Sequence, residues 1–370
     1  MKNPKIMLCG GGTGGHVLPL VAVARAIKKL APEAKIYFVG PEEFSLNALR
    51  EESVIVKTII AAGKIRRYFS FKHIWEIIKI PFAFFQSLII VVSINPDVVL
   101  GKGSYGSVLP VLAAEILFKK IIIHESDAIP GLANKFLSYV TNNIVVSFEE
   151  TKNFFAGKNI QVVGNPVRLK YLDLTKEEAE KILDFPPKES TPSLRSYARC
   201  TIFISGGSQG AQRINKAIFK ILPDLLENFN MIWSVGAANY QSVQHLVLDN
   251  NLKIVPFLNE KELASAYTLC DIAIGRAGAG TIFELAAFGK PSILIPLERK
   301  NGDQPVNASS YAKTGAAVVL KENELDKLKE VIEKILNNSS ELDSMSENAK
   351  KFAKIDAASQ LAQILLDLAK

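Results

Sequence analysis

The segment Gly10–His16, with the sequence GGGTGGH, decides the fold of the first half of the chain. The apolar run Lys5–Cys9 before it is typical of a buried strand, and the run Val17–Ile27 after it has a helical pattern. Pro19 lies in the first turn of that helix, where its missing N–H costs little. A glycine-rich turn between a strand and a helix presents backbone N–H groups at a positive helix end, which favours a phosphate or another anion.

The spacing Gly10-x-Gly12-x-x-Gly15 matches the dinucleotide-binding pattern, but this pattern alone is weak. A tight turn that binds nothing is the plainer interpretation of the glycines. His16 favours a functional interpretation of the loop over a purely structural one, because a histidine at the mouth of such a loop is able to accept a proton near neutral pH. The residues that follow do not supply the Lys-Ser/Thr pair of a P-loop, which excludes that motif.

Composition narrows the class of protein. A chain of 370 residues, 48% of them hydrophobic, predicts two domains with a core each. The net charge of +7 suits acidic ligands or an anionic membrane surface, and without a long basic block or a recognition motif nucleic acid is not an expected partner. Cys9, Cys200 and Cys270 are distant from one another and predict neither disulfides nor a metal site. The chain begins directly with a strand, so we expect no signal peptide.

Polar clusters follow three of the predicted strands in the first half. His16 follows the first, the glycine-rich turn Gly101–Ser107 follows the strand at Asp97–Leu100, and His124–Asp127 follows the strand at Ile121–Ile123. Because ligands bind at the carboxyl ends of parallel strands, we expect all three to face one crevice. Helix capping by Ser126 or Asp127 is the structural alternative.

The segment from Arg66 to Ile94 has a different composition. The apolar run Ile80–Ile94 is shorter than the roughly 20 residues that cross a membrane, and we expect most of Leu88–Ile94 to form a buried helix. Basic and aromatic residues interleave over Arg66–Phe85, which fits an interfacial membrane patch as well as core packing.

The second half repeats the first in outline. Gly164–Arg168 is a turn-rich join that we take as the domain boundary, and the segment 186–199 is expected to be an exposed loop. A third glycine-rich turn, Ser205–Ala211, follows a strand and opens a helix. The predicted fold is α/β, with two Rossmann-like parallel-sheet domains and a helical tail over Asn348–Lys370.

Further features of the second half point to a nucleotide. Gly275–Thr281 opens another helix at a strand end, which gives a second positive terminus. Glu284 lies one turn into that helix, where its carboxylate suits the two hydroxyls of a ribose, although an acid stabilising the helix dipole is the alternative. The segment Asp303–Asn307 supplies amides suited to sugar hydroxyls.

Taken together and in order, these motifs resemble the MurG family of bacterial glycosyltransferases. The resemblance covers nearly the whole chain. It depends on GGTGGH (Gly11–His16), GKGSYGSV (Gly101–Val108), HESDAIPGLAN (His124–Asn134), GNPVR (Gly164–Arg168), GGSQGA (Gly206–Ala211), GRAGAGTIFE (Gly275–Glu284), Gln304 and Asn307. It implies a GT-B fold and transfer of N-acetylglucosamine (GlcNAc) from UDP-GlcNAc to undecaprenyl-diphospho-muramoyl-pentapeptide, which converts lipid I to lipid II in peptidoglycan synthesis.

The resemblance also implies that the two domains bind different substrates. Residues 1–164, joined by a returning C-terminal helix at 353–370, would take the lipid-linked acceptor and face the membrane, and residues 165–352 would bind UDP-GlcNAc. The implied donor-binding residues are Thr13, Gly14, Gly15, Asp127, Arg168, Ser208, Gln209, Leu258, Ala279, Thr281, Glu284, Gln304 and Asn307. The implied residues around the acceptor diphosphate are Gly12, Thr13, Gly14, Gly103, Ser104 and Tyr105.

The implied reaction inverts the anomeric carbon in one displacement, with a base that removes the proton of the acceptor 4-hydroxyl. His16 is the expected base, with Asp127 or Glu125 as a rival or an orienting partner. An Asp-x-Asp pair is not present, so the sequence requires no cofactor and implies no metal, although it leaves a divalent ion open. The implied location is peripheral, on the cytoplasmic side of the cell membrane, with cell-wall synthesis proteins as further partners.

Three positions depart from the family pattern. Asp127 stands where many members have Asn, Ser104 replaces a glycine, and Asp303 stands where a Gln often precedes Gln304. Asp127 adds a second candidate base beside His16.

Three other functions fit parts of the sequence. One is a different GT-B enzyme acting on a glycolipid, against which HESDAIPGLAN argues. A nicotinamide-dependent oxidoreductase, with Glu42 or Glu43 on the ribose, leaves the glycine-rich turns of the second half unexplained. A sugar-nucleotide sensor on the membrane would bind UDP-GlcNAc without turnover.

Overall fold

The chain folds into two units in the computed structural model. The model describes residues 3–12, 14–41, 46–59, 72–185, 200–206, 211–243, 251–298 and 302–370, without the side chains of 72–77. The N-terminal unit comprises Met1–Arg168 and Lys354–Lys370, and the C-terminal unit comprises Leu169–Ala353. The boundaries expected from the sequence lie at 164/165 and 352/353.

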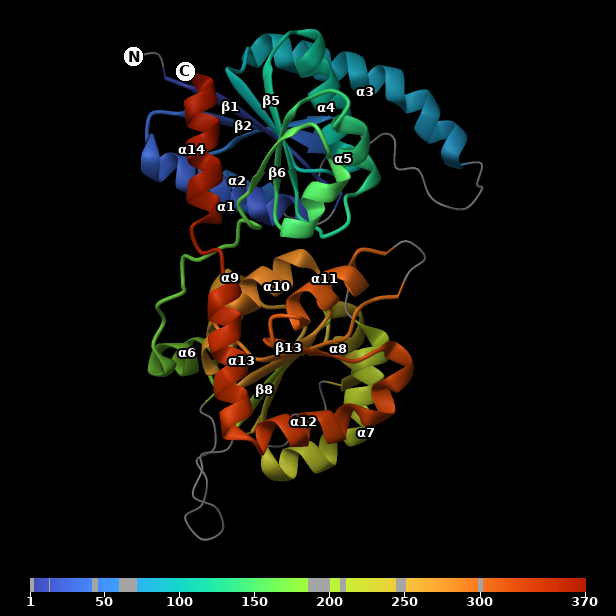
Figure 1. The fold of residues 1–370 in the computed structure, drawn as a ribbon, viewed down its shortest axis with the longest axis vertical. Helices are drawn as coiled ribbons and strands as arrows, with labels where there is room; N and C mark the ends of the chain where they lie inside the picture. The colour runs from blue at the N-terminus through green and yellow to red at the C-terminus, as the bar shows by residue number, and fades with distance from the viewer. Residues whose placement is uncertain are drawn as a thin grey trace. The chain divides into compact units, whose positions relative to one another are not determined.

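The N-terminal unit contains a seven-stranded parallel sheet in the order β3-β2-β1-β4-β5-β6-β7, covered by helices on both faces (Figure 1). The strands are β1 (Lys5–Cys9), β2 (Lys35–Pro41), β3 (Ile55–Ile59), β4 (Val98–Gly101), β5 (Lys120–Glu125), β6 (Asn143–Val146) and β7 (Asn159–Val162). The helices are α1 (Gly14–Leu30), α2 (Leu46–Glu51), α3 (Lys72–Ile94), α4 (Tyr105–Ile116), α5 (Leu132–Leu137), the 3₁₀ helix η1 (Glu149–Phe154) and α14 (Ala357–Ala369).

Alternation along β1 explains the two layers of helices. Ile6 and Leu8 point to one face and join a core made with α1, α2 and α14, whereas Met7 and Cys9 point to the other face and join a core made with α3 and α4. All four side chains are fully buried. A strand buried on both faces reads as a continuous apolar run, which is the pattern of parallel sheets.

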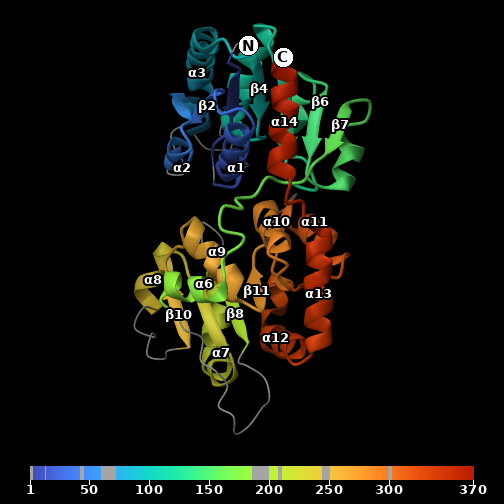
Figure 2. The ribbon, with the colours of Figure 1, turned by 90° about the vertical axis from the view of Figure 1, so that its left-hand side faces the viewer.

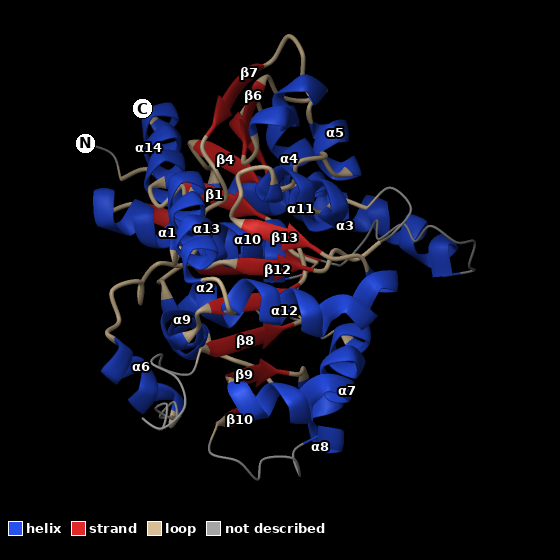
Figure 3. Ribbon diagram, turned by 60° about the horizontal axis from the view of Figure 1, so that its bottom comes forward, coloured by secondary structure: helices blue, strands red, loops and turns tan. Residues whose placement is uncertain are grey.

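The C-terminal unit repeats this plan with a six-stranded parallel sheet in the order β10-β9-β8-β11-β12-β13, and Figure 3 shows its strands between layers of helices. The strands are β8 (Thr201–Ser205), β9 (Asn230–Ser234), β10 (Leu252–Val255), β11 (Ile272–Gly275), β12 (Ser292–Leu294) and β13 (Ala317–Val319). The helices are α6 (Lys176–Leu183), α7 (Gln212–Asn228), α8 (Ala237–Val243), α9 (Glu260–Leu269), α10 (Ala279–Ala287), α11 (Gln304–Ala312), the 3₁₀ helix η3 (Glu322–Lys327), α12 (Leu328–Leu336) and α13 (Ser339–Phe352). The prediction of two α/β parallel-sheet domains is confirmed.

The strand order reverses direction once in each sheet. In the N-terminal unit the chain moves outward from β1 to β3 and then returns to place β4 on the other side of β1. In the C-terminal unit β11 lies beside β8 in the same way. The loops that follow β1 and β4 therefore diverge to opposite sides of the sheet, as do those that follow β8 and β11. Such a reversal point leaves a crevice at the carboxyl ends of the strands, where ligands bind.

One sequence prediction about a helix was wrong. The segment Leu88–Ile94 is helical, but Ile89 and Val92 are exposed, so it is buried on one side only. The tail over Asn348–Lys370 is helical as predicted, apart from a short break between α13, which ends at Phe352, and α14, which begins at Ala357. This break lets α14 return to the N-terminal unit, where it lies beside α1 (Figures 1 and 2). The expected loop at 186–199 lies outside the described residues.

The described residues include no helix that combines the length and the apolar character needed to cross a membrane.

Helix α14 is expected to stabilise the N-terminal unit because Leu361 and Leu365 are fully buried in its core. Replacing Leu361 with Ala should lower the free energy of unfolding of this unit by about 2–5 kcal/mol through lost apolar contact and a cavity. Urea denaturation followed by near-UV circular dichroism measures the change. Gln363→Ala on the exposed side of the same helix is the control, expected within about 0.5 kcal/mol of wild type. Equal stabilities for the two variants would contradict this role of α14.

Candidate functional site

The loop after β1 is shaped by its glycines. Gly11 and Gly12 have φ values of +124° and +96°, a region that favours glycine. A Cβ on Gly12 would lie 2.5 Å from the ring of Tyr105, so only a glycine lets the two loops approach this closely. Helix α1 then begins at Gly14, with Gly14 and Gly15 in its first turn. Thr13 lies outside the described residues.

The loop after β4 packs against the first loop and opens α4. The Lys102 N–H donates to the Cys9 carbonyl at 2.8 Å, and Gly103 has φ +71° with no room for a Cβ beside the Asn134 amide. Ser104 precedes α4 as its N-cap. Its hydroxyl oxygen is buried and makes no hydrogen bond within the described part of the chain. A buried hydroxyl at a positive helix end suits an anionic ligand that would supply the missing partner.

His16 is the third residue of α1, and its side chain is half-buried. Its Nδ1 atom lies 3.2 Å from the Lys102 carbonyl oxygen. Because a carbonyl oxygen only accepts hydrogen bonds, Nδ1 carries the proton in this contact. The neutral ring therefore keeps its lone pair on Nε2, which is the form that a general base requires.

A buried polar cluster lies beneath the two loops. Lys102 is only 1% exposed, and its Nζ atom contacts His124 Nδ1 at 2.7 Å, the Ser126 hydroxyl, and Asn165 Oδ1 at 3.2 Å. His124 donates from Nε2 to the Gly164 carbonyl at 3.0 Å, so its Nδ1 accepts from Lys102. Burial and the neighbouring ammonium hold the pKa of His124 well below its usual range. The cluster thus connects the ends of β4 and β5 to the segment Gly164–Asn165.

Glu125 shapes the loop that follows β5. It is 4% exposed and accepts hydrogen bonds from the Asp127 N–H at 2.9 Å, the Gly131 N–H at 3.0 Å and the Asn134 amide at 2.9 Å. Burial raises the pKa of its carboxyl, and these donors oppose the shift. Asp127 is half-buried on the same loop. Glu125 is occupied in holding this loop, which leaves His16 and Asp127 as the more accessible candidates for the base.

The three polar clusters expected at one edge of the sheet are therefore brought together. His16 contacts the main chain at Lys102, and the Lys102 side chain contacts His124. Sequence reasoning quoted Lys102 within its motif but did not weigh it, although a lysine in an otherwise small and polar glycine-rich loop was a visible signal. It also missed Asn165 and the loop-supporting role of Asn134.

The C-terminal unit brings its two reversal-point loops together in the same way. A Cβ on Gly275, at the end of β11, would lie 2.5 Å from the carbonyl oxygen of Ser205, at the end of β8. Gly278 is the N-cap of α10, whose first residue Ala279 is buried. Thr281 is half-buried in the first turn of the same helix. Ser208 and Gln209, expected at the donor diphosphate, lie outside the described residues.

An ion-pair network supports this edge of the C-terminal sheet. Arg276 pairs with Glu322 at 2.5 Å and donates to the Ile295 carbonyl at 3.1 Å, and Arg213 at the start of α7 pairs with the same Glu322 at 2.6 Å. Glu322 is 7% exposed. The network fixes the loop before α10 to the segment before α12. Sequence reasoning did not identify it, because Glu322 belongs to none of the quoted motifs.

The remaining residues predicted to bind UDP-GlcNAc lie in different surroundings. Glu284 is half-buried in α10, and the side chain of Leu258 is buried. Gln304 accepts from the Leu297 N–H at 2.9 Å through its side chain, and the buried Asn307 donates to the Ala277 carbonyl at 3.3 Å. Both amides thus brace the loops around α10 and α11.

Arg168 is the last residue of the N-terminal unit and is half-buried.

Within the described ranges, His, Cys, Asp and Glu residues form no group of three or more that could hold a metal ion.

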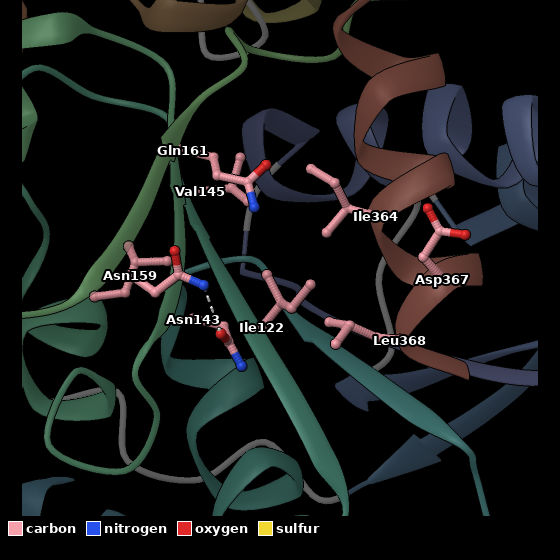
Figure 4. Close-up of a pocket in the computed structure, with 9 residues that line it drawn as sticks. Ile122, Asn143, Val145, Asn159, Gln161, Ile364, Asp367 and Leu368 are labelled. Carbon is pink, nitrogen blue, oxygen red and sulfur yellow. Dashed lines mark hydrogen bonds between the residues drawn. The ribbon is translucent and has the colours of Figure 1, made fainter. Parts of the chain in front are cut away.

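A separate hollow of about 390 Å³ lies in the N-terminal unit between β5, β6, β7 and α14. Figure 4 shows the amides of Asn143 and Asn159 on the strands, across from Asp367 on α14. Asn143 and Asn159 are the first residues of β6 and β7. These two amides therefore mark the side of the hollow opposite the carboxyl ends of the strands, where His124 and Glu125 lie.

Comparison with protein families assigns both halves of the chain. Residues 6–146 match the glycosyltransferase family 28 N-terminal domain, and residues 201–361 match the glycosyltransferase family 28 C-terminal domain. The crystal structure of Acinetobacter baumannii MurG superimposes with a TM-score of 0.72 at 25% identity, covering 98% of this chain and 99% of that one. These matches confirm the GT-B arrangement of two Rossmann-like domains.

Other solved structures share the fold alone. The UDP-GlcNAc 2-epimerase from Neisseria meningitidis, in a structure with UDP-GlcNAc bound, gives a TM-score of 0.70 at 16% identity, covering 99% of this chain and all of that one.

Two relatives that match over nearly their full length carry the same name. The UDP-N-acetylglucosamine–N-acetylmuramyl-(pentapeptide) pyrophosphoryl-undecaprenol N-acetylglucosamine transferase of Caldanaerobacter subterraneus subsp. tengcongensis is 35% identical over 98% of this chain and 99% of its own length. The enzyme of the same name from Thermoanaerobacter sp. is 36% identical with the same coverage. The chain therefore belongs to the MurG family of UDP-N-acetylglucosamine–N-acetylmuramyl-(pentapeptide) pyrophosphoryl-undecaprenol N-acetylglucosamine transferases.

Proposed function

We propose that this chain transfers GlcNAc from UDP-GlcNAc to the 4-hydroxyl of the muramoyl sugar in undecaprenyl-diphospho-muramoyl-pentapeptide, converting lipid I to lipid II. Family membership supports the reaction class. The observation that carries the proposal is structural: each sheet has a reversal point whose loops are built from glycines and helix N-termini. Both substrates carry a diphosphate, and each of the two loop pairs suits one.

The N-terminal unit is the proposed acceptor domain. Its loop amides from Gly12 to Gly14 and from Gly103 to Tyr105 would surround the acceptor diphosphate, with the buried Ser104 hydroxyl as a further donor. The C-terminal unit is the proposed donor domain, with the N-terminus of α10 and the turn at Ser205–Ala211 at the UDP diphosphate. Glu284 would accept the ribose hydroxyls.

The proposed chemistry is one in-line displacement. The acceptor 4-oxygen forms a bond to C1 of GlcNAc while the bond from C1 to the UDP oxygen breaks, which converts the α linkage of the donor to a β linkage. His16 Nε2 takes the proton of the 4-hydroxyl, because Nδ1–H is held by the Lys102 carbonyl. Helix termini and loop amides meet the charge on departing UDP without reorganising.

The peripheral location rests on α3. Ile78, Phe82, Phe85, Ile89 and Val92 are all exposed, between 47% and 70%, and their spacing of three or four residues places them on one side of the helix. Such an apolar stripe next to the basic segment that begins at Arg66 suits the interface of an anionic membrane. We propose that this side of α3 lies on the cytoplasmic face of the membrane. The side chains of 66–77 lie outside the described residues.

A direct test uses UDP-GlcNAc and a lipid I analogue with a short polyprenyl chain. The proposal expects UDP release that depends on the acceptor, with one N-acetylhexosamine added to the lipid by mass, and much less product from UDP-GalNAc. Binding of UDP-GlcNAc without release would indicate a sensor, and stabilisation by NADH in place of UDP would indicate an oxidoreductase.

Replacing His16 with Ala should lower kcat by about 10²- to 10⁴-fold while the KM for UDP-GlcNAc stays near wild type, since the base is lost from the acceptor domain. Steady-state kinetics with the lipid I analogue measure both constants. Asp127→Asn is the comparison variant. Near wild-type turnover in His16→Ala together with a large loss in Asp127→Asn would move the role of base to Asp127.

Replacing Glu284 with Gln should raise the KM for UDP-GlcNAc by about tenfold to a hundredfold, because an amide supplies one accepting oxygen where two hydroxyls need partners. Isothermal titration with UDP checks the same loss at the level of binding. Glu330→Gln, on the exposed side of α12, is the matched control and should bind UDP like wild type. Unchanged UDP affinity in Glu284→Gln would refute the ribose contact.

Replacing Phe82 and Phe85 together with Ser should reduce sedimentation with phosphatidylglycerol vesicles by about tenfold or more, because both rings are over 60% exposed on α3. Phe219→Ser, an exposed ring on α7, is the control and should sediment like wild type. Full vesicle binding by the double variant would place the membrane surface elsewhere.

A further inference from the structure

Lys102 is the most deeply buried charged side chain within the described residues. Its three described polar contacts, with His124, Ser126 and Asn165, are all with neutral groups, and together they match the three N–H bonds of an ammonium. Within the described residues no carboxylate forms a salt bridge with Nζ. A buried ammonium held only by neutral acceptors is costly unless a negative charge lies near.

Among the described residues, Glu125 and Asp127 supply part of that charge without a salt bridge to Nζ, and the position of Lys102 suggests a second source. It lies between Gly101 and Gly103 in the loop whose amides face the proposed acceptor diphosphate. The same residue contacts His16 through its carbonyl and the Cys9 carbonyl through its N–H, so its main chain joins the two glycine-rich loops. Its side chain turns inward beneath them, out of contact with solvent.

Three titratable side chains lie close enough to interact with the Lys102 ammonium, and a fourth contacts its main chain. His124 is on β5, Glu125 and Asp127 follow along the same segment, and His16 is on α1. Burial lowers the pKa of Lys102 to about 8, with the charges of Glu125 and Asp127 opposing the shift. His124 stays neutral because burial and Lys102 lower its pKa.

We propose that Lys102 strengthens binding of the acceptor diphosphate by its positive charge, acting through space from beneath the loop, and that it takes up a proton when the diphosphate binds. The inference rests on the proposed function and adds to it a residue that attracts the substrate without touching it. The proton comes from the buffer: neutral amine plus proton gives ammonium, and no bond of the substrate changes.

The direction of the proton transfer follows from the coupling between acceptor binding and protonation of Lys102. A bound anion favours the ammonium form and raises the pKa of Lys102 above its value of about 8 in the free protein. The diphosphate of the acceptor is a diester whose own charge is constant above about pH 3. Proton uptake by Lys102 should therefore approach about half a proton at pH 8 and vanish near pH 6.5, where the free protein already carries the ammonium.

Isothermal titration of the intact protein with the short-chain lipid I analogue, in two buffers of different ionisation enthalpy, measures this proton uptake. Wild type should take up protons at pH 8, and the part of the uptake that depends on Lys102 should vanish at pH 6.5. Lys102→Met should take up about half a proton less than wild type at pH 8 and the same amount as wild type at pH 6.5, and it should bind the acceptor about tenfold more weakly at pH 7, which corresponds to a shift of about one pKa unit. Its affinity for UDP should stay at the wild-type value.

Lys120→Met is the matched control, because Lys120 begins β5 at the opposite end from His124 and is exposed. It should take up protons like wild type. If Lys102→Met fails to fold, Lys102→Arg provides the same test, since arginine is charged at both pH values and should bind the acceptor with about half a proton less uptake than wild type at pH 8.

Acceptor binding without proton uptake by wild type at pH 8, or uptake at pH 8 that is the same in wild type and in a folded Lys102 variant, would overturn the inference and leave the proposed function intact. Absence of acceptor binding at every pH, with UDP binding retained, would instead refute the proposed acceptor and this inference with it.

Discussion

The reversal of strand order in each parallel sheet is the constraint on which the proposed sites depend. At these points adjacent strands send their loops in opposite directions, which leaves backbone N–H groups and helix N-termini without partners from the neighbouring connection. Glycines let the loops approach each other where any side chain would collide, as between Gly12 and Tyr105 or between Gly275 and Ser205. Each of the two units contains one such reversal point with a pair of closely packed loops.

Buried polar contacts hold these loops in place, and the two units use different chemistry for the purpose. The N-terminal unit uses a lysine and a histidine beneath the loops and a carboxylate, Glu125, that accepts from the following loop. The C-terminal unit uses two arginines on one carboxylate, Glu322. Anion sites built on backbone amides need such support, because a loop that is free to move loses binding energy to its own ordering.

The sequence was sufficient to predict the fold, because apolar runs and glycine-rich turns alternate with little ambiguity from Lys5 to Leu320. It was also sufficient to predict which loops meet in the N-terminal unit. The sequence did not predict contacts between residues that are far apart in the chain. Glu322 pairs with Arg276, and Asn165 accepts a hydrogen bond from Lys102, although no local sequence pattern connects either pair. The prediction also failed along Leu88–Ile94, where a helix rich in apolar residues is buried on one side only. Hydropathy alone does not separate an interfacial helix from a core helix.

The most direct test of this account is a crystal structure of the protein with UDP and the short-chain lipid I analogue. The account predicts the acceptor diphosphate against the amides of Gly103–Tyr105 with the muramoyl 4-hydroxyl within hydrogen-bond reach of His16 Nε2, and the UDP diphosphate at the N-terminus of α10. A diphosphate bound away from both reversal points, or a 4-hydroxyl out of reach of His16 and Asp127 alike, would contradict it.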